Sequence, residues 1–254
     1  MMRRFFRFLA FIPLAYVAVS FYLPLLLMFL VSVSGEKGVS IYFDVLLNEN
    51  YVRIALYSLY IAALTTLSTL VLSLPAAYYL AFYVPERYKM NILLAFNIPL
   101  LINLLLKAYA LLNLLSFLGL ANTFTGMMVG MVYEYLPLML LPIYSSFERI
   151  NRRLLEAAET LGARPREKFF KVVLPLSLPG IISGVTLVSL MAFTEFVIPA
   201  MLGGIHGYTL GYLIWDLFLK FRNWEAGSAL SFAVTLVAVL VATIYSVKGE
   251  RVEV

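Results

Sequence analysis

The sequence predicts an all-α polytopic membrane protein with six transmembrane helices and both termini in the cytoplasm. Hydrophobic residues make up 63% of the 254 residues, charged residues only 13%, and the mean hydropathy is +0.93. An ordinary soluble domain has about 45–50% apolar and about 25% charged residues. Because so few charges cannot cover a soluble core of this size, we expect a lipid bilayer to surround most of the chain.

Six long stretches with little or no charge set the expected spans. A helix needs about 20 apolar residues, at about 1.5 Å each, to cross the hydrocarbon layer. The expected spans are residues 8–33, 56–83, 91–113, 126–147, 178–202 and 227–247. The first is expected to be a retained anchor, because its apolar run is longer than the about 7–15 residues of a signal-peptide core. Prolines within several spans predict kinked helices that pack on one another.

The distribution of basic residues predicts the orientation. If the N-terminus is cytoplasmic, most of the 19 Lys and Arg residues lie on the inner side. The positive-inside rule then places both termini in the cytoplasm and the chain in the cytoplasmic membrane as a multi-pass protein. The net charge of +5 is therefore interpreted as a topology signal, and nucleic acid is not an expected partner.

The composition also argues against an enzyme. The chain has no Cys and a single His, His206, which excludes thiolate chemistry, disulfides and most histidine-based metal or catalytic sites. Polar residues within the spans are thinly scattered and form no clustered catalytic set. We therefore expect no catalytic residues, no metal and no cofactor in this chain itself.

One sizeable loop, residues 148–176, is expected on the cytoplasmic side, within a single transmembrane domain that covers residues 1–254. Its first part is predicted to be a short helix, and Gly162 then supplies a residue that tolerates positive φ at the helix end. A second short helix is expected from Pro165 until about Pro175. The predicted apolar positions of the two helices are Ile150, Leu154, Leu155, Ala158 and Leu161, then Phe169, Phe170, Val172 and Val173. By composition alone, such a basic loop could equally hold anionic lipid headgroups.

A motif in this loop favours a more specific interpretation. The residues that carry it are Glu156, Ala157, Ala158, Gly162, Leu174 and Pro175. They resemble the EAA motif of ABC-importer permeases, EAA-x3-G-x9-I-x-LP, with Val172 in place of the isoleucine. The resemblance implies the ABC-importer permease (MetI-like) fold and identifies residues 148–176 as the segment that couples the permease to an ATPase. We call these residues the coupling segment.

The resemblance also implies partners. These would be ABC ATPase subunits that use ATP and Mg²⁺, a second permease subunit that is homologous or identical, and an extracytoplasmic solute-binding protein. The ATPase must be another polypeptide, because the sequence has no G-x-x-x-x-G-K-[ST] phosphate-binding loop. Small side chains at Ala157 and Ala158 would allow close docking, Glu156 would offer an ionic contact, and Gly162 would set the angle between the two short helices.

Three further segments, residues 97–115, 131–147 and 194–204, are similar to permeases of the spermidine/putrescine family. The similarity implies a polyamine as the solute. The last segment also resembles importers of other solutes, so ferric iron, thiamine, molybdate/tungstate or sulfate remain alternatives. A secondary transporter is a further alternative. Such proteins often contain inverted repeats, and we find none in this sequence.

Three ionisable residues, Lys107, Glu134 and Glu195, are expected about 9–12 Å below the outer interface. Charges that face lipid are costly, so these should face the helix bundle or a wet cavity. Lys107 can neutralise one glutamate, which leaves a formal charge of −1 that suits a cation better than an oxyanion. We hypothesise that Glu195 lines the path and attracts an ammonium group, with cation–π help from tyrosines. The alternative is that these residues only hold helices together. The candidate tyrosines are Tyr109, Tyr133 and Tyr135.

Overall fold

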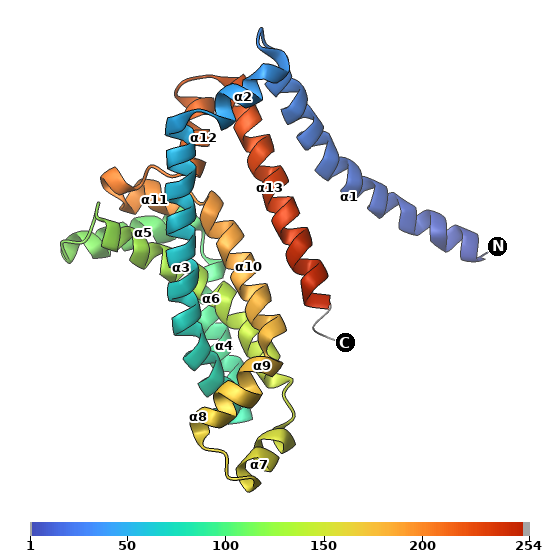
Figure 1. Cartoon of the computed structure of the whole chain (residues 1–254), viewed down its shortest axis with the longest axis vertical. Helices are drawn as coiled ribbons and strands as arrows, with labels where there is room; N and C mark the ends of the chain where they lie inside the picture. Colours follow the sequence, from blue (N-terminus) through green and yellow to red (C-terminus); the bar gives the residue numbers. More distant parts are fainter. Residues whose placement is uncertain (1, 251–254) are drawn as a thin grey trace. The chain divides into compact units, whose positions relative to one another are not determined.

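The computed structural model describes the backbone of residues 2–250 and the side chains of residue 13 and residues 15–243. No strand occurs between residues 2 and 250, so the predicted all-α class is confirmed. The helices form two compact units (Figure 1). Of the described residues, one unit contains those up to Val52 together with Leu213–Val239, and the other contains Arg53–Tyr212 and those from Leu240 to Glu250.

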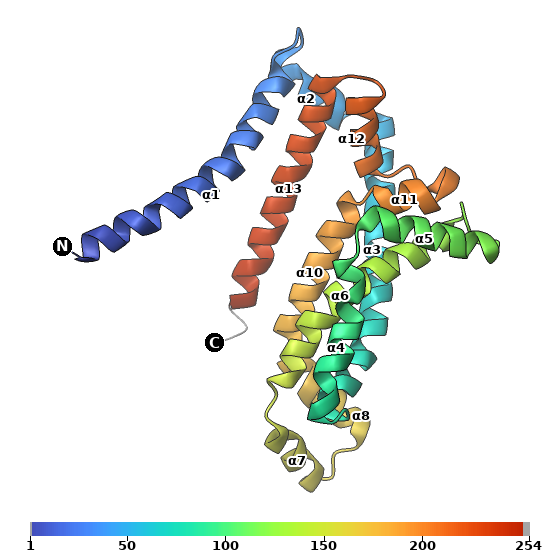
Figure 2. The same cartoon turned by 180° about the vertical axis from the view of Figure 1, so that it is seen from behind.

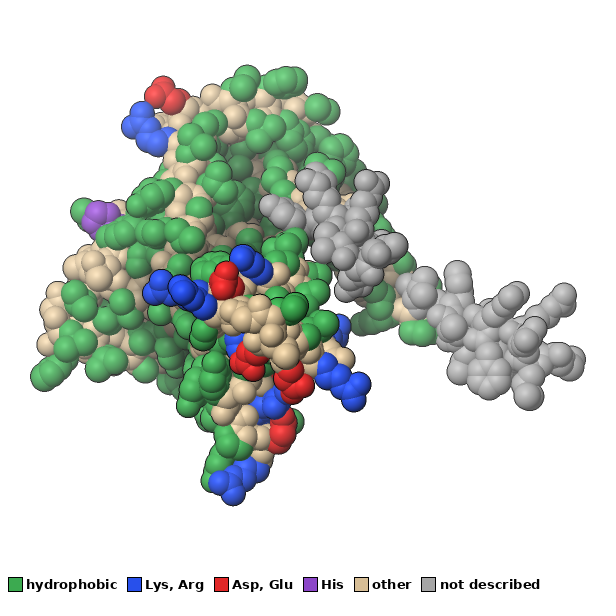
Figure 3. Space-filling model, turned by 60° about the horizontal axis from the view of Figure 1, so that its bottom comes forward, with side chains coloured by type: hydrophobic (Ala, Val, Ile, Leu, Met, Phe, Trp, Pro, Cys, Tyr) green, Lys and Arg blue, Asp and Glu red, His purple; other side chains and the backbone are tan. Residues whose placement is uncertain are grey.

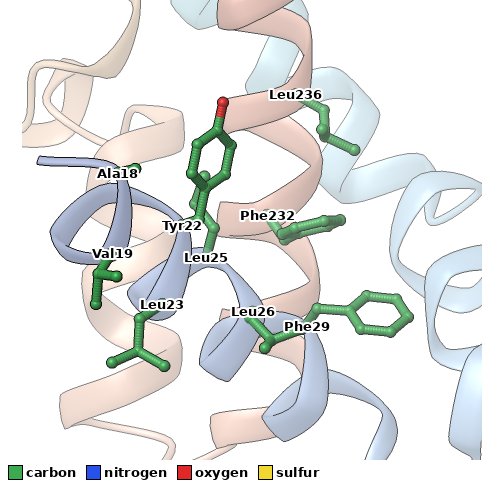
Figure 4. Close-up of a pocket in the computed structure, with 9 residues that line it drawn as sticks. All are labelled: Ala18, Val19, Tyr22, Leu23, Leu25, Leu26, Phe29, Phe232 and Leu236. Atoms are coloured by element: carbon green, nitrogen blue, oxygen red, sulfur yellow. The ribbon is translucent and has the colours of Figure 1, made fainter. Parts of the chain in front are cut away.

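The first unit is built from α1 (Met2–Val33), η1 (Gly38–Ser40), α2 (Ile41–Leu46), most of α12 (Leu210–Leu219) and much of α13 (Trp224–Glu250). The rings of Phe29, Tyr42 and Phe232 pack with centroids 5.5–6.4 Å apart. An apolar groove of about 780 Å³ lies between α1 and α13 (Figure 4). Many large apolar side chains of α1 are exposed, as expected of a helix that faces lipid or another membrane protein.

The second unit is organised around α6 (Phe124–Glu148), whose side chains Met131, Met139 and Ile143 are completely buried. Around it lie α3 (Glu49–Phe82), α4 (Glu86–Leu101), α5 (Leu104–Phe117), α10 (Leu178–Thr194) and α11 (Val197–Leu202), followed by η3 (Gly204–His206). The most extensive packing joins α6 to α10. In both views α5 and α11 lie side by side and cross the long helices steeply (Figure 1, Figure 2).

Glycines explain the close approach of α10 to α6. A Cβ added to Gly180 would lie 2.4 Å from the Cβ of Ser146 and 2.5 Å from the carbonyl oxygen of Pro142. One added to Gly184, one helical turn later, would lie 3.0 Å from the sulfur of Met139. Helices within membranes use small residues in this way, because dispersion contacts rather than water exclusion hold them together.

Four of the described helices are long and apolar enough to cross a membrane, and two bent helix pairs raise the number of possible spans to six. The four are α1, α3, α6 and α13, which match the expected spans 8–33, 56–83, 126–147 and 227–247 to within several residues at each end. The six predicted spans are therefore accounted for only if each bent pair counts as one.

The third expected span, 91–113, bends far more sharply than a proline kink. It is divided into α4 and α5, which differ in direction by 96°. Ile102 is extended, and the side chain of Asn103 accepts hydrogen bonds from the backbone N–H groups of Leu105 and Leu106. This cap satisfies donors at the start of α5, so the chain can change direction at this exposed break without leaving them unpaired.

The fifth expected span, 178–202, is interrupted as well. Its first helix, α10, ends at Thr194, and Glu195 is extended with ψ of 135°. The shorter α11 then begins at Val197. The carboxylate of Glu195 accepts backbone hydrogen bonds at the start of α11, which explains why the break falls at this residue.

Candidate functional site

The coupling segment folds as two short helical pieces joined by a turn. The first is α7 (Arg152–Thr160), and the second runs through α8 (Pro165–Lys168), a π-helical turn η2 (Phe169–Val173) and α9 (Leu174–Leu176). Gly162 has φ of +81°, which confirms the predicted left-handed turn residue. Pro165 is the first residue of the second piece, as predicted.

Side-chain caps begin both pieces. Asn151 accepts a hydrogen bond from the backbone N–H of Arg153 at 3.0 Å, which caps α7. Glu167 accepts one from the backbone N–H of Arg164 at 3.0 Å. That hydrogen bond, together with the ammonium group of Lys171 at 3.0 Å, lowers the pKa of Glu167 below its usual range. The carboxylate form of Glu167 therefore stabilises the start of α8.

The predicted apolar stripe of this segment is only partly buried. Ile150 and Val173 are buried, whereas Leu154 and Phe170 are exposed and Leu161 is 89% exposed. Helical periodicity identifies an apolar face but not what covers it, so the sequence alone did not indicate how much of this face is buried. The motif residues Glu156, Ala157 and Gly162 are also exposed. This surface of α7 and the following turn is therefore open in the chain alone.

Pro175 lies one residue before the end of the second piece, so the predicted end is correct to within one residue. It lies within α9, and the helix continues to Leu176 before the chain bends by 68° into α10. Proline cannot supply a backbone N–H, and in this segment it follows directly on a π-helical turn, where the α-helical hydrogen-bond pattern is already interrupted. The motif residue Leu174 is half-buried beside it.

Aromatic residues anchor the coupling segment to the core of the second unit. The ring of Phe169 lies edge-on to the ring of Tyr78 of α3, with centroids 5.3 Å apart. Tyr78 also contacts Phe147, near the end of α6, at 6.2 Å. The segment is thus attached by one apolar side, while charged side chains gather at the same end of the unit (Figure 3). The ion pairs within the segment are Lys168–Glu159 and Lys171–Glu167.

The second candidate region is an interior charged layer, which consists of Lys107, Glu134 and Glu195. The ammonium group of Lys107 lies 2.6 and 2.8 Å from the two carboxylate oxygens of Glu134, and the lysine is only 5% exposed. The prediction that Lys107 pairs with a glutamate is confirmed. Only the structure identifies that partner as Glu134 of α6 rather than Glu195.

Glu195 is held by other groups. One of its carboxylate oxygens accepts hydrogen bonds from the backbone N–H groups of Phe196 at 3.0 Å and Val197 at 2.8 Å. The other accepts one from the hydroxyl of Tyr135 at 2.7 Å. These neutral donors leave the negative charge of the carboxylate uncompensated, so the layer has a formal charge of −1, as its composition suggested.

The three candidate tyrosines differ in position. Tyr135 is buried and donates to Glu195, whereas Tyr109 of α5 and Tyr133 of α6 are exposed. Sequence reasoning missed Asn103, although an asparagine directly before an apolar helical run is a recognised N-cap signal. It also missed Thr209, whose hydroxyl donates to the carbonyl oxygen of Glu195 at 3.0 Å, and no local signal indicated that contact.

Residues 73–252 match the family model described as "Binding-protein-dependent transport system inner membrane component". The spermidine/putrescine transport system permease protein PotB of Salmonella typhimurium is 36% identical over 217 residues, which covers 79% of this chain and 75% of the relative. The molybdenum transport system permease protein ModB of Azotobacter vinelandii is 34% identical over 171 residues, covering 62% of this chain and 75% of the relative.

Two solved structures share the fold. A chain of a bacterial ABC transporter involved in the import of the acidic polysaccharide alginate superposes with a TM-score of 0.78, at 15% identity, over 98% of this chain and 96% of the other. A chain of the inward-facing MetNI methionine ABC transporter superposes with a TM-score of 0.63, at 17% identity, over 79% of this chain and 95% of the other. At these identities the similarity extends to the fold alone.

Proposed function

The chain belongs to the family of inner membrane components of binding-protein-dependent transport systems, and from this premise we propose that it conducts polyamines such as spermidine and putrescine into the cell. The family makes it a multi-pass membrane permease subunit of an ABC importer. One observation carries the choice of solute, namely 36% identity to a spermidine/putrescine permease over most of both chains.

The charge of the interior layer supports this choice. Polyamines are cations at neutral pH, and the carboxylate of Glu195 is held by the hydroxyl of Tyr135 and by backbone N–H groups, which are neutral donors that leave its negative charge in place. In the proposed mechanism this charge attracts an ammonium group as the solute passes the break between α10 and α11. The exposed rings of Tyr109 and Tyr133 would contribute cation–π contacts.

ATP hydrolysis would reach this region through the coupling segment. A separate ATPase would hold the exposed surface formed by Glu156, Ala157 and Gly162, and Mg²⁺ and ATP would act in that partner. Movement of the segment would pass to α6 through the aromatic contacts and to α10 through the chain itself. Because α10 ends at Glu195, its displacement would move the charge in the path. Alternating access of this kind would also require a second permease subunit and a solute-binding protein outside the predicted outer face.

Uptake of labelled spermidine into cells that carry the complete transporter tests the solute. Glu195→Gln should reduce uptake strongly, while the matched control Glu36→Gln, an exposed glutamate in the first unit, should not. Excess unlabelled putrescine should compete. Unchanged uptake in Glu195→Gln at normal membrane abundance would refute the role of Glu195.

A molybdenum compound is the second candidate, favoured by the 34% identity to a molybdenum permease. Uptake of labelled molybdate that excess spermidine does not reduce would replace the polyamine proposal. It would leave the coupling mechanism in place, since that mechanism concerns the ATPase and not the solute.

Coupling is tested by cysteine cross-linking, which the absence of native cysteines makes simple. Ala157→Cys should cross-link to an ATPase subunit in membranes, whereas Ser40→Cys, on an exposed position predicted to lie outside, should not. Failure of Ala157→Cys to capture an ATPase would refute the proposed coupling.

A further inference from the structure

Two buried lysines join the α4–α5 pair to α6, one near the start of α4 and one in the first turn of α5. Lys89, near the start of α4, lies 2.8 Å from a carboxylate oxygen of Glu148 and is 4% exposed. Lys107, just after the break into α5, binds Glu134. Both glutamates belong to α6, and their positions are about 21 Å apart along that helix at about 1.5 Å per residue. Sequence reasoning singled out only the second pair.

The pair at Lys89 also reaches the coupling segment. The same ammonium group lies 2.8 Å from Oε1 of Glu86, the first residue of α4. That oxygen lies 3.5 Å from the guanidinium of Arg152, the first residue of α7. Arg152 additionally donates to the carbonyl oxygen of Ala81, near the end of α3, at 3.5 Å. Two cations and two anions therefore connect α4, α6 and α7 in one neutral cluster.

The links in this cluster differ in strength. An ammonium group is almost never buried unless it is paired, and removing one partner of a buried pair leaves an uncompensated charge. Lys89 is buried whereas Glu148 is 37% exposed, so the cost of breaking their contact comes mainly from the buried ammonium group, and the contact joins α4 to α6 more firmly than a fully exposed pair would. Arg152 and Glu86 are 60% and 74% exposed, and exposed pairs at such distances contribute little to stability. The link to α7 can break and re-form while α4 and α6 stay together.

We propose that Lys89 is a positioning residue for transport. It makes α4 and α6 move as one body, and it holds Glu86 where this glutamate can contact Arg152 of the coupling segment. This inference rests on the proposed function, since it assumes that an ATPase moves the segment. Beyond the break, Lys107 of α5 is paired with Glu134 of α6, so movement that enters at Arg152 reaches the interior charged layer through this body. Without Lys89 the ATPase should still dock, but much less of its movement should reach α5 through α4, while the route through α10 to α11 stays in place.

The test uses the transporter assembled with its ATPase in lipid vesicles. Hydrogen exchange of residues 104–117 and 197–202 is measured without nucleotide and with ATP plus vanadate, a readout that requires no knowledge of the solute. In the unsubstituted chain, nucleotide should change exchange in both stretches. Lys89→Met should reduce the change in residues 104–117 by about fivefold or more, the lower end of usual coupling between two sites, while residues 197–202 should still respond through α10. Lys89→Arg, which keeps the charge, should restore most of the change in residues 104–117.

Two further variants keep the test decisive. Lys37→Met removes a lysine from an exposed ion pair with Asp44 and should respond to nucleotide like the unsubstituted chain. Glu86→Gln removes the exposed contact to Arg152 and keeps the pair of Lys89 with Glu148, so it should fold even if Lys89→Met does not. It should also weaken the nucleotide response.

The outcomes separate this inference from the proposed function. Suppose that Ala157→Cys still captures the ATPase but Lys89→Met responds fully to nucleotide. The role of Lys89 is then refuted and the proposed function stands. If Lys89→Met does not fold, a full response of Glu86→Gln has the same meaning. If Ala157→Cys captures no ATPase in the unsubstituted background, the proposed coupling fails, and the inference fails with it.

Discussion

The interior charged layer and the coupling segment both contain lysine–glutamate pairs, but in opposite environments. Lys107 and Glu134 are 5% and 14% exposed, whereas Lys171 and Glu167 in the coupling segment are 74% and 42% exposed. A buried pair must stay intact because either partner alone would be a buried charge, whereas an exposed pair is screened by water. The comparison suggests that the first region specifies the fold and that the second is shaped for a partner.

Removal of Lys107 should have the largest effect on folding. Lys107→Met leaves Glu134 buried without its cation, which should reduce the free energy of unfolding by about 3–5 kcal/mol. Thermal unfolding of the purified protein in detergent measures the loss. The double variant Lys107→Met with Glu134→Leu should recover most of it, and a double variant no more stable than the single one would contradict the explanation.

Gly180 should be the next most sensitive position, because α10 and α6 meet there without space for a side chain. Gly180→Ala places a methyl group 2.4 Å from the Cβ of Ser146, and overpacking of this kind costs about 1–3 kcal/mol. The unfolding temperature should fall accordingly. Ser183→Ala, an exposed position on the same helix, serves as the control and should leave it nearly unchanged.

The cap at the break between α4 and α5 should contribute less. Asn103→Ala removes the acceptor for the N–H groups of Leu105 and Leu106 and should cost about 1 kcal/mol. Asn103→Asp, which keeps an acceptor oxygen, should be milder. Faster hydrogen exchange at the start of α5 would locate the effect, and equal stability of the alanine variant would show that the break needs no cap.

Ala157→Leu should have the smallest effect on folding and a large effect on transport. The position is exposed, so the free energy of unfolding should change by less than about 0.5 kcal/mol. The added volume should nevertheless block docking of the ATPase and abolish solute uptake. Ala157→Ser, which adds a single oxygen atom, is the matched control. Transport at the normal rate in Ala157→Leu would show that the exposed surface of the coupling segment is not shaped for an ATPase.

Much of the architecture could be predicted from local patterns. Long apolar stretches located four helices that the structure confirms, and Gly162 and Pro165 marked the turn of the coupling segment correctly. The two interrupted spans could not be predicted in the same way, because hydropathy measures how well a stretch tolerates lipid and not whether it is straight. At both breaks a polar side chain, Asn103 or Glu195, replaces backbone hydrogen bonds that a continuous helix would have made.

Composition by itself determined that this chain is a helical membrane protein, because a chain with so little charge can bury its apolar groups only in lipid and must satisfy its backbone within helices. The EAA-like motif indicated that residues 148–176 contact an ATPase. Only the tertiary structure decided that Lys107 binds Glu134, that Tyr135 binds Glu195, and that Lys89 is buried against Glu148. Each of these contacts joins residues far apart in the chain, and their distances depend on how the helices pack.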